Sequence, residues 1–198
     1  RIFQVHQRLA AFRARKAGEI LNYFDELKRT MEWLAQDPRV VFLGQTTAVP
    51  GTFMYPTLKD VPAGRALEMP VNESFQMQLT LGLALAGYVP VSIYPRQNFL
   101  LLAAGDMANM LDKLPQMTDG RVSPRIIIRT AVGPDEPVHP GHQHVGNYAE
   151  AFRRMLAYVD VVELNEPGDI FPAYERALTR ADAKPMLLIE HGNYYNAK

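Results

Sequence analysis

One acidic side chain, Glu73, stands at the start of a segment that is otherwise almost wholly apolar or small. Pro70 closes an extended segment and Asn72 is a good helix cap, so the sequence predicts a helix from Glu73 to about Gly87. A helix this apolar is expected to be buried, and the carboxylate of Glu73 is expected to be buried with it. A buried carboxylate needs a partner or a proton, as at many functional sites. The alternative is an exposed Glu73 that only complements the helix dipole.

Three histidines, His139, His142 and His144, lie close together in a loop rich in Pro and Gly. Imidazole is a common metal ligand, so the loop could serve a metal-dependent enzyme. The pattern favours this weakly, because no cysteine flanks the loop, few acids lie near it, and the His-x-x-x-His spacing of helical metal sites is missing. A single neutral histidine could instead move a proton or hydrogen-bond a substrate oxygen.

Strands that alternate with helices are expected to position these groups. Short apolar runs predict strands at about 39–44, 88–93, 125–130, 159–164 and 186–190. The helices predicted between them cover about 73–87, 99–117, 147–156 and 170–181, the last after a turn at 165–169. Two more helical patterns come first, over Ile2 to Phe12 and over Ile20 to Leu34. The alternation predicts an α/β fold of three layers, αβα, with a mainly parallel central sheet. We divide the chain into an N-terminal helical extension, 1–36, and one domain, 37–198.

Composition and charge fit one globular domain that has no polyanionic partner. The chain has 198 residues, of which 47% are hydrophobic, enough to bury a core without disulfides. Lys and Arg number 21, as do Asp and Glu, so no net charge favours nucleic acid or an anionic membrane. The lack of cysteine excludes thiolate chemistry, and no apolar run reaches the roughly 20 residues of a membrane span. We expect a cytoplasmic location.

The segment around Glu73 resembles one protein family. It reads Glu-Met-Pro-Val-Asn-Glu at 68–73, then a helix rich in Gly and Ala, then Gly-Tyr-Val-Pro-Val at 87–91. This order is similar to the acidic-x-Pro-Leu-Ser-Glu, helix and Gly-Tyr-x-Pro-Val of a family of thiamine-diphosphate enzymes. The family includes transketolase and the beta subunits of 2-oxo-acid dehydrogenases, and further similar segments extend from Asp37 to Leu188. The resemblance implies a pyrimidine-binding domain of that family.

The resemblance also implies roles for four residues. The glutamate that matches Glu73 activates thiamine diphosphate by sharing a proton with a pyrimidine nitrogen, which a Gln could not do. Phe99 matches the aromatic residue that stacks on the pyrimidine, although composition alone would place it in the core. Val71 falls in the matched segment as a further cofactor-binding residue, and His144 matches the active-site histidine. The implied activity is decarboxylation or dehydrogenation of a 2-oxo acid, or ketol transfer.

The same resemblance implies that the chain is one half of an enzyme. In the family, another domain marked by Gly-Asp-Gly binds the diphosphate and its Mg²⁺, and the sequence Gly-Asp-Ile at 168–170 lacks the second Gly. We therefore expect an alpha-type, diphosphate-binding partner subunit, assembly as a homodimer or heterotetramer, and a 2-oxo acid or sugar phosphate as substrate. Gln45 and Thr46 stand where the family has Glu-Asp after Gly44. A catalytically silent structural or regulatory relative is therefore the alternative.

Overall fold

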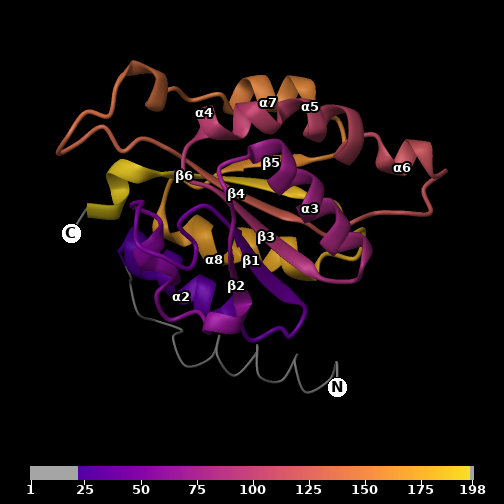
Figure 1. Ribbon diagram of the computed structural model, residues 1–198, viewed down its shortest axis with the longest axis horizontal. Coiled ribbons are helices and arrows are strands. Elements are labelled where there is room, and N and C mark those ends of the chain that lie inside the picture. Colours follow the sequence, from indigo (N-terminus) through magenta and orange to yellow (C-terminus); the bar gives the residue numbers. More distant parts are fainter. Residues whose placement is uncertain (1–21, 197–198) are drawn as a thin grey trace.

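The computed structural model describes residues 22–196 and arranges them as one sheet between two layers of helices (Figure 1). Six strands pair in the order β2-β1-β3-β4-β6-β5, and all pairs are parallel. The strands are β1 Val40–Gly44, β2 Ala66–Glu68, β3 Val89–Tyr94, β4 Ile127–Val132, β5 Asp160–Glu163 and β6 Met186–His191. The three-layer fold with a parallel sheet is therefore confirmed.

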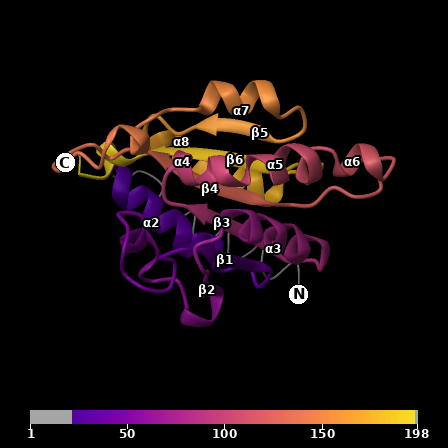
Figure 2. The same cartoon turned by 45° about the horizontal axis from the view of Figure 1, so that its top comes forward.

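Each face of the sheet has its own hydrophobic core. Alternate residues of a strand point to opposite faces, so in β4 Ile127 packs into one core and Ile128 into the other. The first core lies under the helices α2 Tyr23–Leu34 and α8 Pro167–Thr179. The second lies under α3 Glu73–Leu85, α4 Gln97–Leu100, α5 Ala104–Asp106, α6 Leu114–Met117 and α7 Ala149–Met155, which Figure 2 shows from a tilted view. Within residues 22–196, no helix has the length and apolar character needed to cross a bilayer.

Short helical turns join these elements. They are η1 Tyr55–Leu58, η2 Ala63–Arg65, η3 Leu101–Ala103, the π-helical η4 Met107–Leu111, η5 His142–His144 and η6 Gly192–Asn196. The continuous helix predicted over 99–117 is therefore wrong. It is a series of short α, 3-10 and π segments, and Met107 and Leu111 of η4 are buried in the second core.

Helix α2 belongs to the core of the described fold. It begins at Tyr23, where the side chain of Asn22 accepts a hydrogen bond from the backbone N–H of Asp25 at 2.9 Å. Its residues Leu27 and Met31 are fully buried in the core that α8 covers. The helical pattern over Ile2 to Phe12 lies outside the described residues. The boundary placed between residues 36 and 37 stays a prediction.

Helix α8 begins earlier than predicted. Glu166 and Asp169 form a capping box, in which the carboxylate of Asp169 accepts from the backbone N–H of Glu166 at 3.0 Å. Pro167 is then the first helical residue, a position where its fixed φ suits the helix and its missing N–H costs nothing. The turn predicted at 165–169 is therefore mostly helix, because the proline marked a helix start and not a break.

The composition of α3 predicted a helix buried on all sides. This prediction is wrong, because one side of the helix is exposed. Met77, Thr80 and Leu81 face the second core, whereas Phe75 is 48% exposed and Leu85 is 55% exposed. The two residues are ten apart, about 2.8 helical turns, so they lie within about 80° of each other on the outward side. One face of α3 thus carries apolar side chains that nothing in residues 22–196 covers.

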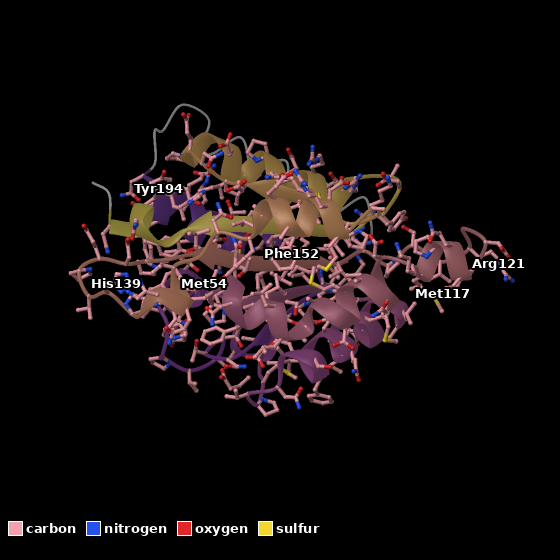
Figure 3. All side chains as sticks on the ribbon, turned by 90° about the horizontal axis from the view of Figure 1, so that it is seen from above. Met54, Met117, Arg121, His139, Phe152 and Tyr194 are labelled. Atoms are coloured by element: carbon pink, nitrogen blue, oxygen red, sulfur yellow. The ribbon has the colours of Figure 1, made fainter. Side chains whose placement is uncertain are left out.

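Parallel pairing places the carboxyl ends of all strands at one edge of the sheet. The segments after β1, β2, β3, β4 and β6 therefore meet there, at the left of Figure 1, where the loop at 133–148 and η6 lie. Figure 3 shows labelled residues from the segments before and after β4 at opposite ends of the molecule. His139 marks the carboxyl side, and Met117 and Arg121 mark the amino side. In open α/β sheets, ligands bind beyond the carboxyl ends of the strands.

Candidate active site

Glu73 is the first residue of α3 and is only 6% exposed. The helix starts there because the side chain of Asn72 accepts a hydrogen bond from the backbone N–H of Phe75 at 2.9 Å. The amide of Gln45 donates to Oε1 of Glu73 at 3.3 Å, and the hydroxyl of Tyr94 donates to the Glu73 backbone carbonyl at 3.3 Å. The predicted burial of this acid at a helix start is confirmed.

A second acid holds the loop that carries Gln45. The carboxylate of Glu68, at the end of β2, accepts hydrogen bonds from three successive backbone N–H groups. These belong to Thr46 at 2.6 Å, Thr47 at 3.0 Å and Ala48 at 2.9 Å. Gln45 directly precedes them, so the short segment 68–73 supplies both the buried acid and the anchor for its amide partner.

The contact between Gln45 and Glu73 should stabilise the fold measurably. Gln45→Glu is expected to lower the free energy of unfolding by about 1–3 kcal/mol at neutral pH, because it replaces a donor with a second carboxylate beside a buried one. Adding Glu73→Gln restores one amide and one carboxylate, so the double variant should return to within about 0.5 kcal/mol of the wild type. Urea denaturation measures both values. Equal stability of Gln45→Glu and the wild type would contradict the contact.

Phe99 and His144 lie together at the same edge. Their ring centroids are 5.5 Å apart, and Nδ1 of His144 lies 3.2 Å from Oδ1 of Asn98. A carbonyl oxygen can only accept a hydrogen bond, so this contact requires a hydrogen on Nδ1 of His144. Both rings are half-buried. No hydrogen bond or ring contact joins Glu73 to Phe99 or His144. Strand β3 links Glu73 to this ring pair along the chain, because its last residue, Tyr94, contacts Glu73 and is followed by the segment that carries Phe99.

Sequence reasoning missed the residues that hold this histidine loop. Gln97 is buried, accepts from the backbone N–H of Tyr148 at 2.5 Å and donates to Asn147 at 3.5 Å. Arg96 donates through Nη1 to the two carbonyls at 133–134, at 2.8 and 3.2 Å. Arg96, Gln97 and Asn98 therefore all bind one loop. Three consecutive polar side chains directly after a buried strand were the signal that could have found them.

The other two histidines point to each other and not to His144. The ring centroids of His139 and His142 are 5.3 Å apart, and both side chains are exposed. His139 lies near the outer end of the loop in Figure 3. In the described part of the chain, no group of three or more His, Cys, Asp or Glu side chains is placed to hold a metal ion. The geometry thus gives the metal reading of this loop no support.

Val71 lies in the turn between β2 and α3 with 80% of its surface exposed. No contact within residues 22–196 assigns it a task. Its cofactor-binding role stays a prediction.

Comparisons with known proteins agree on one family. A family model described as transketolase, pyrimidine binding domain, matches residues 26–197. The pyruvate dehydrogenase E1 component subunit beta of Gracilaria tenuistipitata var. liui is 26% identical over 180 residues, which cover 88% of this chain and 54% of that protein. The 3-methyl-2-oxobutanoate dehydrogenase subunit beta of Mycobacterium tuberculosis (strain CDC 1551 / Oshkosh) is 27% identical over 168 residues, which cover 83% and 47%.

A solved structure shares the fold. A split gene transketolase, an inactive beta4 tetramer, has a TM-score of 0.63 and 16% sequence identity, and the match covers 87% of this chain and 51% of that chain. The present chain thus spans about half the length of the relatives that it matches.

Proposed function

Because the chain belongs to the transketolase pyrimidine-binding domain family, we propose that it is the pyrimidine-binding half of a thiamine-diphosphate-dependent enzyme. The observation that carries the proposal is the buried carboxylate of Glu73 at the carboxyl edge of a parallel sheet. The reaction would be 2-oxo-acid decarboxylation or dehydrogenation, or ketol transfer. An alpha-type partner subunit would supply the diphosphate and Mg²⁺ sites, in a homodimer or heterotetramer in the cytoplasm.

The residues at this edge fit the pyrimidine end of the cofactor. When bound, thiamine diphosphate would supply the carbanion chemistry. Glu73 would hold a proton against a ring nitrogen, and its burial would keep water from competing for that hydrogen bond. Phe99 would offer a flat face, and such stacking contributes about 0.5–1.5 kcal/mol beyond area burial. Nε2 of His144 would exchange a proton with the substrate or hydrogen-bond its oxygen.

Binding of the cofactor should require both halves of the site. We expect the chain alone to bind thiamine diphosphate weakly. Addition of a diphosphate-binding partner and Mg²⁺ should lower the Kd at least about tenfold, since charge-assisted contacts to the diphosphate are then made. Isothermal titration of the chain, the partner and their mixture tests this. Equal affinity of the mixture and of the partner alone would contradict a shared site.

A second candidate function is that of a catalytically silent structural or regulatory subunit. The specific observation in its favour is the amide of Gln45, which lies against Glu73 where the family resemblance expects an acid. Such a subunit would bind the partner without supporting turnover. Activity assays of the mixture with a 2-oxo acid and with a ketose phosphate separate the two functions.

A further inference from the structure

Arg96 carries a charge at the carboxyl edge that no acid of residues 22–196 neutralises. Its Nη1 donates to the carbonyls at 133–134 and, at 3.5 Å, to the carbonyl of His144. Its guanidinium carbon lies 5.4 Å from the centroid of the Phe53 ring. No carboxylate within residues 22–196 forms an ion pair with Arg96, and its Nε and Nη2 make no hydrogen bond there.

Arg129 and Arg180 have acids that offset their burial, whereas Arg125, which is half-buried like Arg96, donates only to backbone carbonyls within residues 22–196. Arg129 pairs with Glu190 at 2.6 Å, and Arg180 pairs with Asp160 at 2.6 Å. Burial lowers the pKa of Arg96, and no neighbouring acid opposes it. A half-buried guanidinium without a counter-charge is costly to keep. An anion from outside the described chain would offset that cost.

We propose that Arg96 binds the anionic group of the substrate, the carboxylate of a 2-oxo acid or the phosphate of a sugar phosphate. The three carbonyls fix the Nη1 side of the guanidinium, which leaves Nε–H and Nη2–H as a fork for two anion oxygens. Arg96 also contacts the backbone of His144 and precedes Phe99 by three residues. An anion on the fork would therefore lie at the same edge of the sheet as Phe99 and His144. The identity of the ligand as substrate rests on the proposed function.

Anion titration of the chain without cofactor tests the proposal. Pyruvate, its uncharged methyl ester and inorganic phosphate are titrated calorimetrically at low ionic strength. We expect pyruvate or phosphate to bind and methyl pyruvate not to bind. Arg96→Met should raise the Kd of the anion at least about tenfold, because a hydrogen bond to a charged group is lost. Arg96→Lys keeps the charge but loses the fork, so its affinity for the anion should lie between those of the wild type and Arg96→Met. Tighter binding of pyruvate than of phosphate indicates a 2-oxo acid substrate. Tighter binding of phosphate indicates a sugar phosphate substrate.

A matched control separates anion binding from support of the loop. Arg125 is another half-buried arginine that donates to a backbone carbonyl, that of Ala177 at 3.0 Å, but it lies at the amino edge before β4. Arg125→Met should leave anion affinity unchanged, with circular dichroism to verify that each variant is folded. Absence of saturable anion binding, or equal affinity in Arg96→Met, overturns the proposal. Because no cofactor is present, this outcome is independent of whether thiamine-dependent turnover is found.

Discussion

Exchange of Glu73 for Gln is expected to lower turnover by the reconstituted enzyme about 10²–10⁴-fold, the range for loss of a general acid or base. Gln fills the same volume and can still accept from the amide of Gln45, so the fold should persist. It cannot exchange a proton with a ring nitrogen. Steady-state assays with the partner subunit, thiamine diphosphate, Mg²⁺ and a 2-oxo acid or ketose phosphate measure the loss.

Glu150→Gln is the matched control for that assay. Glu150 is an exposed acid on α7 whose carboxylate pairs with Arg154 at 2.9 Å. The same chemical change there should leave turnover within about twofold, since exposed pairs contribute about 0–1 kcal/mol to stability. Turnover of Glu73→Gln that matches the Glu150→Gln control would remove Glu73 from the mechanism.

Exchange of Glu190 for Gln is expected to lower the free energy of unfolding by about 3–5 kcal/mol, the cost of leaving one charge of a buried pair alone. Glu190 and Arg129 are both fully buried, on the adjacent strands β6 and β4, and are joined by bonds of 2.6 and 2.9 Å. Tyr174 donates to the carboxylate at 2.7 Å, and Tyr195 of η6 also donates to it. Burial and then Glu190 raise the pKa of both tyrosines well above their ordinary value, so both stay protonated donors.

Urea denaturation with a double variant tests the pair. Arg129→Met combined with Glu190→Leu should cost less than the two single variants together, because neither charge is then left alone. The exposed pair Arg154 and Glu150 is the comparison, and its loss should cost no more than about 0.5 kcal/mol. A single Glu190→Gln variant within 1 kcal/mol of the wild type would show that the carboxylate is not needed against Arg129.

Much of the fold could be predicted from local pattern. The runs that became β1, β4 and β6 are short, apolar and rich in branched residues, and such runs suit strands buried on both faces. The alternation of strands and helices then requires crossovers and hence a parallel sheet. One error arose because composition was used without periodicity. α3 was expected to be buried because it is apolar, yet its outward face, with Phe75 and Leu85, is exposed.

The site could be predicted only in part. Glu73 was predictable because a helix cap, a proline and an apolar run fix where it stands in the chain. The pairing of His144 with Asn98 and the position of Arg96 were not, because they depend on how a long loop after β4 folds back on the segment after β3. The run of three polar side chains at 96–98 could have marked this segment as functional, but no local pattern says which distant loop it contacts. The roles of Glu73, Phe99, His144 and Val71 stay predictions.

A crystal structure of the chain with its partner subunit, thiamine diphosphate and Mg²⁺ tests the central claim most directly. We expect a carboxylate oxygen of Glu73 at about 2.6–3.2 Å from a pyrimidine ring nitrogen, with the Phe99 ring stacked against the pyrimidine. A cofactor whose pyrimidine lies away from Glu73, while that carboxylate still faces only Gln45, would contradict it.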